Sequence, residues 1–169
     1  FSDSVKIFMQ LMQEDPEIMK KLGVSGLLAD YITVSEEILA AVSPVMAEVL
    51  DWVVIECAAD FPELEIFCKE HELGQLKFIA LDRPASIPQA PKTKGIPLPE
   101  ILEFKAPLKE WGEKYFSRFT LLKDEINFWN ESGNNRPEAP YEWLSTTGIH
   151  LTNSNVSIGK VQSGSLGFL

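Results

Sequence analysis

Two apolar segments on either side of one helical segment constrain this fold more than any other feature. Trp52–Cys57 is rich in β-branched residues and lacks apolar/polar alternation at its start, which is typical of a buried strand. Leu76–Leu81 reads as a second strand. Between them, residues 60–71 have helical spacing, and Gly74 stands where a left-handed helix terminator belongs. A strand, a helix and a strand in this order predict a parallel crossover with the helix packed on the sheet.

The residues before this unit have helical patterns. Ser4–Leu22 has the apolar spacing of a helix, with an interruption predicted near Asp15-Pro16. Thr33-Val-Ser-Glu36 is a capping-box pattern and predicts a helix that continues to about Leu50. Pro44 lies inside that helix and is expected to break or kink it.

The second half follows a stretch that contains five prolines, residues 84–99, which predicts an extended connector between two lobes. We therefore expect a first lobe over residues 1–83 and a second over residues 100–169. The second lobe is predicted to hold apolar-periodic pieces, a helix and short strands separated by turns. These are Ile101–Phe104, Leu108–Phe119, a strand Phe119–Leu122, a helix Glu125–Trp129, and strands Tyr141–Thr146, Ile149–Thr152 and Val156–Ile158. The fold class is mixed α/β (α+β).

Composition limits the class of protein. With 45% hydrophobic and 24% charged residues, the chain has globular averages and is not expected to be disordered. No apolar run approaches the ~20 residues that span a bilayer, and no signal peptide is expected, so we predict no membrane partner. The two cysteines, read as free, favour an intracellular location. Because residue 1 is Phe and not Met, we expect an excised fragment.

Charge is divided unevenly. Residues 1–91 carry 16 acidic and 6 basic side chains, whereas residues 92–169 carry 9 of each. An acidic surface repels phosphates, so any binding of nucleic acid is expected to be weak. From Trp143 onward the only charged side chain, with His neutral, is Lys160. This neutral tail is predicted to be either sheet interior or a buried interface.

No catalytic or metal site is predicted. Gly159-Lys160 lacks the upstream glycine and the following Ser/Thr of a P-loop, and there is no paired-Cys zinc spacing. His71 is interpreted as the polar end of a helix stripe and His150 as a strand flank. Glu63, Glu65, Glu70 and Glu72 are interpreted as a solvated helix face. No cofactor is expected.

Two further groups of side chains have structural interpretations. Cys57 and Cys68 are expected to be free, buried and structural. Trp111, Phe116 and Phe119, near Lys114 and Arg118, could form a base-stacking platform, but their near-helical spacing favours core positions.

Gly23-Val-Ser-Gly-Leu-Leu-Ala-Asp30 has the pattern G-V-x-G-x-L-x-D, and Leu73–Arg83 has the pattern L-G-x-x-x-F-I-x-L-D-R. In these two segments the chain resembles the hinge domain of structural-maintenance-of-chromosomes (SMC) proteins. Ile96–Phe104 and Thr147–Lys160 match more loosely. Three positions depart from the family pattern: Thr147-Gly148 replaces Asp-Gly, Asn155 replaces a turn glycine that Asn can mimic at positive φ, and Lys160 replaces the second of two closing glycines.

This resemblance implies two small pseudo-symmetric lobes with mixed sheets and flanking helices. It implies a non-catalytic dimerisation module that joins two coiled-coil arms of a chromosome-organising ATPase, so that the complex encloses or tethers DNA. The expected partner is a second SMC hinge, as homodimer or heterodimer, and the expected location is chromosome-associated, in a bacterial nucleoid or a eukaryotic nucleus.

Candidate residues follow from the resemblance. The expected dimer interface is the neutral tail, at Val156, Ile158, Gly159, Lys160 and Gly164; internal sheet is the alternative for these strands. Lys160 is expected to affect how tightly two hinges pair.

The candidates for weak, salt-sensitive DNA contact are basic residues of the second half, namely Lys105, Lys109, Lys114, Arg118 and Lys160. Two other functions stay open. One is a hinge-like module of a non-condensing scaffold with a different partner. The other is a small-molecule-binding α/β domain, for which the sequence shows no convergent polar pocket.

Overall fold

The computed structural model describes residues 2–87, 95–123 and 136–159. Two short helices begin it, α1 (Asp3–Glu14) and α2 (Pro16–Lys21). The Ser2 hydroxyl accepts a hydrogen bond from the first turn of α1, and the Asp15 carboxylate does the same for α2, whose first residue is proline. The predicted interruption of the first helix at Asp15-Pro16 is confirmed.

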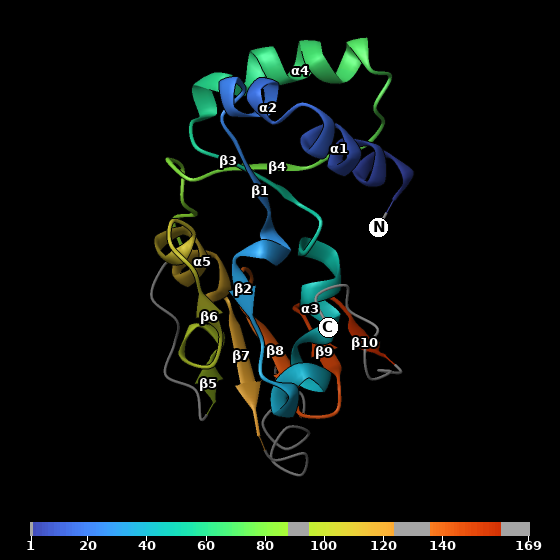
Figure 1. The fold of residues 1–169 in the computed structure, drawn as a ribbon. Helices are drawn as coiled ribbons and strands as arrows, with labels where there is room; N and C mark the ends of the chain where they lie inside the picture. The colour runs from blue at the N-terminus through green and yellow to red at the C-terminus, as the bar shows by residue number, and fades with distance from the viewer. Residues whose placement is uncertain (1, 88–94, 124–135, 160–169) are drawn as a thin grey trace.

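A three-stranded sheet, here called the first sheet, has the order β1-β3-β4. Its strands are β1 (Val24–Leu27), β3 (Val53–Ile55) and β4 (Phe78–Ala80). Strand β3 pairs with β1 antiparallel and with β4 parallel, and the 3-10 turn η3 (Ala58–Asp60) and helix α4 (Phe61–Glu70) make the crossover from β3 to β4. The predicted parallel crossover is confirmed. In Figure 1, α1, α2 and α4 lie over one face of this sheet.

A five-stranded sheet, here called the second sheet, has the order β10-β9-β8-β7-β5. Its strands are β5 (Ile96–Pro97), β7 (Phe119–Leu122), β8 (Glu142–Ser145), β9 (Ile149–Leu151) and β10 (Val156–Ile158). All pairs are antiparallel except β7 with β8, which are parallel. Four strands predicted in residues 119–158 are thus confirmed, whereas the predicted helix Glu125–Trp129 lies outside the described residues.

The two halves of the chain repeat one another in order and pairing. Strand β1 is followed by the 3-10 turn η1 (Leu28–Asp30) and strand β2 (Ile32–Thr33), as β5 is followed by η4 (Leu98–Glu100) and β6 (Glu103–Phe104). In both halves a helix then leads to a strand, β3 or β7, that pairs antiparallel with the first strand and parallel with the next. The equivalent strands β2 and β6 pair with each other. This arrangement is a pseudo-symmetric duplication.

The packing does not separate the halves. A central core joins α3 (Leu39–Val49) to helix α5 (Lys109–Phe116) and to both sheets, and it includes Val54, Ile79 and Leu144. An outer core lies between the first sheet and α1, α2 and α4. A small outer cluster of Leu122, Ile149 and Leu151 lies on the second sheet. Each sheet therefore has an inner face toward the central core and an outer face away from it. The division into lobes at residues 83 and 99 stays a prediction.

Two local predictions are wrong, and the break expected at Pro44 does not occur. Thr33 lies in β2 and does not cap a helix; Ser35 precedes the 3-10 turn η2 (Glu36–Ile38), which leads into α3. Helix α3 runs through Pro44. The proline removes the donor for the Ala40 carbonyl, but the Ser43 hydroxyl donates to that carbonyl at 3.3 Å. Gly74 does not end α4 in a left-handed conformation, because Glu72 takes that role at φ 51°.

The predicted connector, residues 84–99, contains β5 and the start of η4. Its role as a link between two lobes stays a prediction.

Candidate dimerisation edge

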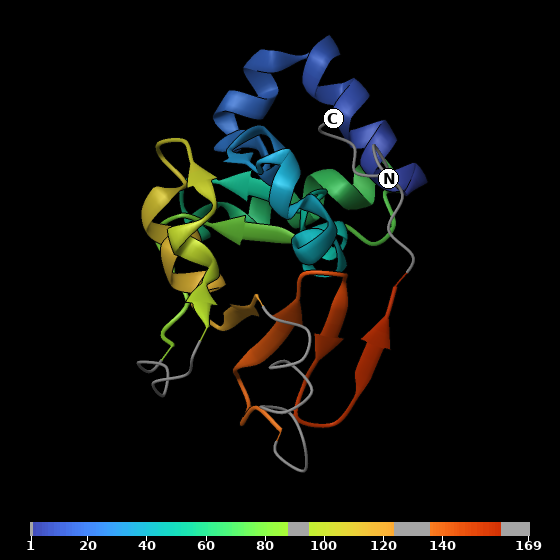
Figure 2. The same ribbon diagram turned by 90° about the horizontal axis from the view of Figure 1, so that it is seen from below.

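Strand β10 is the outermost strand of the second sheet, and in Figure 2 it lies beside β9 at the outer side of the red strands. All three of its residues are exposed. Ile158 is 74% exposed and Val156 42%, and Ile158 is the most exposed large hydrophobic side chain in the described residues. An edge strand with neither charge nor proline is poorly protected against pairing with another chain.

The hydrogen bonds of the β9–β10 hairpin determine where the β10 backbone points. The Thr152 N–H donates to the Asn155 carbonyl at 2.9 Å at the turn. Bonded and non-bonded pairs alternate along an antiparallel ladder, so the next bonded pair is His150 with Ser157. The N–H and C=O groups of Val156 and Ile158 therefore point away from β9, toward an edge with which no other described strand pairs, here called the open edge.

The side chains of Val156 and Ile158 lie on the outer face of the second sheet. Val156 is opposite Leu151 and Ile158 is opposite Ile149, and directly opposite residues share a face. Leu151 and Ile149 are buried in the outer cluster, at 2% and 9% exposure. The exposed pair thus continues an apolar surface beyond its last buried strand.

The turn before β10 differs from the prediction. Among the described non-glycine residues only Glu72 has a positive φ, so Asn155 does not maintain the turn through a left-handed conformation. Instead, the Thr152 hydroxyl oxygen accepts from the Asn155 N–H at 3.1 Å and donates to the Asn155 side-chain oxygen at 3.0 Å. Gly148, in the preceding turn, does have a positive φ of 92°.

The remaining interface candidates are only partly described. Gly159 is exposed, and a Cβ built there would meet nothing closer than the Gly148 carbonyl at 3.9 Å, so the fold of a single chain does not require glycine. Lys160 and Gly164 lie outside the described residues. The interface assignment therefore stays a prediction.

The β1 edge, by contrast, is closed by side chains of its own half. The Asp30 carboxylate accepts from the Leu27 N–H at 2.9 Å, and the Tyr31 hydroxyl donates to the Ser25 carbonyl at 2.7 Å. Burial, and then the nearby Asp30 charge, raise the pKa of Tyr31, so the hydroxyl keeps its proton in this position. Two outward groups of β1 are thus satisfied within the chain.

The other two sheet edges differ again. Strand β5 contains Pro97, which has no N–H to donate. Strand β4 is the outer strand of the first sheet. The residues on either side of it, Lys77 and Leu81, form backbone hydrogen bonds with β3. By alternation, the backbone groups of Phe78 and Ala80 point outward; the Ala80 carbonyl accepts from the Arg83 N–H.

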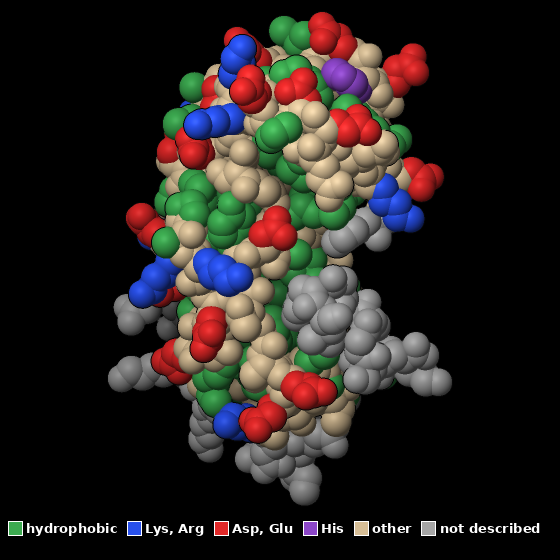
Figure 3. All heavy atoms as spheres, viewed as in Figure 1, with side chains coloured by type: hydrophobic (Ala, Val, Ile, Leu, Met, Phe, Trp, Pro, Cys, Tyr) green, Lys and Arg blue, Asp and Glu red, His purple; other side chains and the backbone are tan. Residues whose placement is uncertain are grey.

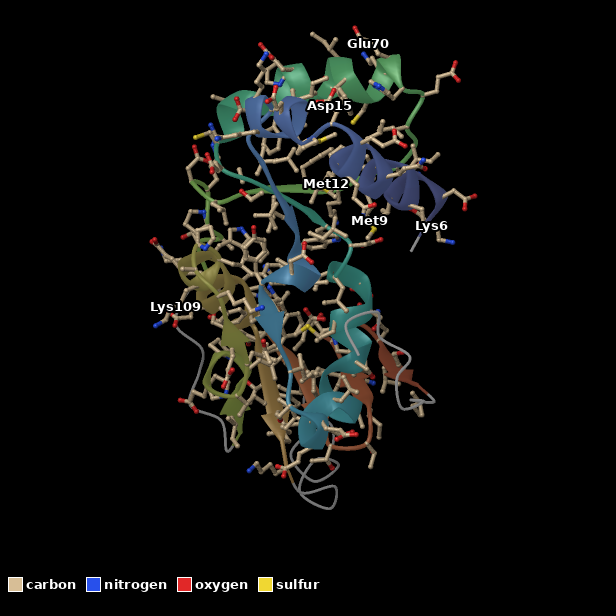
Figure 4. The ribbon with its side chains drawn as sticks, viewed as in Figure 1. Lys6, Met9, Met12, Asp15, Glu70 and Lys109 are labelled. Atoms are coloured by element: carbon tan, nitrogen blue, oxygen red, sulfur yellow. The ribbon has the colours of Figure 1, made fainter. Side chains whose placement is uncertain are left out.

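Two of the four described basic candidates are exposed and two contact other side chains, while Lys160 lies outside the described residues. Lys109 points outward from α5 in Figure 4, and Lys105 is also exposed. Lys114 is ion-paired with Glu110 at 3.2 Å. Arg118 stacks over the Tyr115 ring at 4.3 Å, and burial raises the pKa of that tyrosine. In Figure 3, acidic side chains lie among the basic ones and gather around α1, α2 and α4. DNA contact stays a prediction.

The candidate base-stacking aromatic residues are part of the core. Trp111, Phe116 and Phe119 are at most 5% exposed. Both cysteines are free, but the prediction that both are buried is wrong: Cys57 is exposed and Cys68 half-buried. His150 lies within β9, with Nε2 2.7 Å from the Glu142 carboxylate, and does not flank the strand.

Two features are absent from the described residues. No cluster of three or more His, Cys, Asp or Glu side chains there could hold a metal ion. None of the described helices is both long and apolar enough to cross a membrane.

The family model of the flexible hinge domain of SMC proteins matches residues 20–125, more than half of the chain. No curated protein matches the chain.

Solved structures match with the same overall fold. The SMC hinge domain of Pyrococcus furiosus has a TM-score of 0.67 at 17% identity, with 98% of each chain covered. Another Pyrococcus furiosus hinge, with an extended coiled coil, has a TM-score of 0.68 at 17% identity. This chain is covered to 95% but spans only 60% of that one.

A third match is an asymmetric dimer of the Geobacillus stearothermophilus SMC hinge domain. Its TM-score is 0.68 at 17% identity, covering 96% of this chain and 67% of that one. At this identity the structures support the fold and not a particular function.

Proposed function

This chain belongs to the family of SMC flexible hinge domains, and from that premise we propose that it pairs two copies of a chromosome-organising SMC ATPase. The hinge itself is not an enzyme. In this proposal it joins two coiled-coil arms, whose distant heads hydrolyse ATP, and the paired arms enclose or tether DNA in condensation, cohesion or segregation. The protein is then chromosome-associated.

The observation that supports pairing is the open edge at β10. Val156 and Ile158 expose apolar side chains and direct their backbone groups outward. Strand addition at such an edge satisfies the backbone groups and buries the side chains together. That the Geobacillus stearothermophilus hinge is described as a dimer agrees with this proposal.

The test is the solution mass of the chain by light scattering over a wide concentration range. We expect a dimer that is lost when Val156→Glu and Ile158→Glu are combined, with Kd rising at least about 100-fold. The reason is that burying each side chain contributes about 1.5–3 kcal/mol, and about 1.4 kcal/mol corresponds to a factor of ten.

The matched control is Ile66→Glu, which changes an exposed isoleucine on α4 (56% exposed) in the same way. It should leave the dimer intact. A wild-type chain that is monomeric at every concentration would overturn the homodimer proposal and would favour pairing with a different hinge or scaffold protein.

DNA contact is a secondary part of the proposal. With a net charge of −10 and basic side chains already paired at Lys114 and Arg118, binding should be weak and should weaken further with salt. Fluorescence anisotropy with labelled DNA at several salt concentrations measures this slope, and binding that is unaffected by salt would contradict it.

A further inference from the structure

Helix α4 exposes apolar side chains on the side away from its core contacts. Leu64 and Phe67, on its core side, are buried. On the other side, Ile66 is 56% exposed, and Pro62, one turn before it, is also exposed. A single exposed isoleucine is ordinary on a protein surface, so the neighbours of Ile66 decide whether it belongs to a binding surface.

These exposed residues are continuous with a shallow apolar groove between α4 and the segment that leads into β4. The groove has a volume of about 250 Å³. Its apolar lining is Phe61, Leu64, Cys68, Leu73, Leu76 and Phe78. By helical spacing, Glu65 and Lys69 lie between the groove and Ile66, and they form an ion pair at 2.8 Å that offsets both charges. The groove, this ion pair, Pro62 and Ile66 are here called the α4 surface.

Acidic side chains border the α4 surface on the side away from the groove. Glu63 precedes Ile66 by three residues and Glu70 follows it by four, so both lie beside it on the helix. Neither forms an ion pair with any residue that the structure describes. Figure 4 shows Glu70 on the side of α4 that points away from the first sheet. Because residues 60–75 carry five acidic side chains and one basic side chain, the charge of this border is not balanced locally.

The acidic border limits the class of partner that fits the surface. Nucleic acid and anionic membranes carry negative charge and are repelled by it. An uncharged strand such as β10 would cover the apolar residues but leave the border without opposite charges. A helix with apolar residues at i, i+3, i+4 and i+7 and with Lys or Arg beside them complements both the apolar residues and the border.

We infer that the α4 surface binds a basic amphipathic helix of another protein. The apolar side chains of that helix cover Ile66 and Pro62 and place one side chain in the groove, and its basic side chains lie beside Glu63 and Glu70. In Figure 1, α4 lies at the end of the molecule away from the second sheet, so this contact leaves the open edge at β10 uncovered. The inference goes beyond the proposed pairing of two hinges and does not depend on it.

A model peptide tests the class of partner. The probe is a labelled peptide of about 20 residues, built from Leu and Lys so that its leucines share one face of a helix. The controls are a peptide of the same composition in scrambled order and a peptide with Glu in place of Lys. Fluorescence anisotropy with the whole chain should give a Kd for the probe at least about 10-fold lower than for either control. Equal binding of the scrambled peptide would show only general attraction to an acidic protein and would overturn the inference.

An apolar substitution tests the location of the contact. Ile66→Ser should raise the Kd of the probe about 10-fold, because the peptide would no longer bury this side chain. The matched control is Ile7→Ser, which changes an isoleucine of α1 that is 46% exposed and should leave the Kd unchanged. Equal effects of the two substitutions would place the peptide elsewhere and contradict the inference.

Charge reversal tests the role of the border. Glu63→Lys combined with Glu70→Lys should weaken binding of the probe and strengthen binding of the Glu-containing peptide. The matched control is Glu36→Lys combined with Glu37→Lys, which makes the same change in net charge at exposed positions of η2. If both pairs of substitutions weakened binding equally, net charge alone would account for the attraction and the inference would be wrong.

Light scattering of the same variants separates this inference from the proposed pairing. None of these substitutions alters β10, so each variant should have the same solution mass as the parent. A parent chain that is monomeric but binds the probe at α4 would overturn the pairing and support this inference. A dimer that binds the probe and the scrambled peptide equally would support the pairing and overturn this inference.

Discussion

Strands β1 and β10 are edge strands of the two sheets in one duplicated fold, yet their outward-pointing backbone groups differ in whether side chains of the same chain bond to them. At β1, Asp30 and Tyr31 satisfy the Leu27 N–H and the Ser25 carbonyl from within the chain. At β10, the outward groups of Val156 and Ile158 adjoin side chains that are 42% and 74% exposed. A backbone N–H or C=O group at a sheet edge needs a hydrogen-bond partner when it is removed from water. That partner is either a side chain of the same chain or a strand of another chain.

This difference limits the sheet edges at which the chain can pair with a strand of another chain. Strand β1 follows η1, whose Asp30 and neighbouring Tyr31 turn back onto it, and β5 contains Pro97. The two extra strands β9 and β10 have no equivalent in the first half and carry the open edge away from the central core. Protection of some edges and exposure of others directs association to a defined surface.

The largest effect is expected when β10 loses its outward donors. Ile158→Pro removes an N–H that points away from β9, so the hairpin should survive and the dimer should be lost. Ser157→Pro removes an N–H directed at His150 and should destabilise the monomer by about 1–3 kcal/mol. Solution mass and urea unfolding distinguish the two. If Ser157→Pro spared folding and Ile158→Pro abolished it, the assigned orientation of β10 would be reversed.

A smaller effect is expected when the β1 edge is opened. Asp30→Ala leaves the partly buried Leu27 N–H without its acceptor and should lower the free energy of unfolding by about 1–3 kcal/mol. Asp30→Asn keeps an acceptor oxygen and should cost less. Urea unfolding at one fixed protein concentration measures both, preferably in the monomeric Val156→Glu, Ile158→Glu background. Equal stability of the alanine variant and the parent would show that Asp30 does not protect this edge.

The smallest effect concerns Tyr31. Tyr31→Phe removes the hydrogen bond to the Ser25 carbonyl and should cost about 0.5–1.5 kcal/mol at neutral pH. The folded pKa of Tyr31 is raised, chiefly by burial, so the folded state binds more protons than the unfolded state above about pH 10. Its contribution is present below that pH and is lost as pH rises through the folded pKa.

The pH dependence gives the check on this assignment. The stability difference between the parent and Tyr31→Phe should shrink or reverse above about pH 10. Tyr115 also has a raised pKa, so the comparison must be between the two proteins and not across pH for one of them. A stability difference that stays constant from neutral to strongly alkaline pH would contradict the role of the Tyr31 hydroxyl.

Much of the element order could be predicted from local patterns. The crossover β3–α4–β4, the break at Asp15-Pro16 and the strand at Val156–Ile158 follow from residue spacing and from proline chemistry. The errors are at positions where a neighbour alters a local rule. Helix α3 tolerates Pro44 because Ser43 bonds the freed carbonyl, and Glu72 rather than Gly74 takes the left-handed position.

The candidate site was predictable only in part. The neutral tail indicated an interface at Val156 and Ile158, but no sequence pattern indicated the shallow groove beside α4 that Leu64, Cys68 and Phe78 help to line. Its lining comes from α4, from the loop after it and from β4, and only packing brings these residues together.

The sequence by itself determined the family, the order of helices and strands, and the absence of charge along β10, because these depend on residue type and short-range spacing. The tertiary structure alone decided which sheet edges are closed and which stay open. Pairs such as β1 with β3 and β2 with β6 join residues far apart in the chain. Their register determines which backbone groups and side chains face outward, since a shift of one residue moves each side chain to the opposite face.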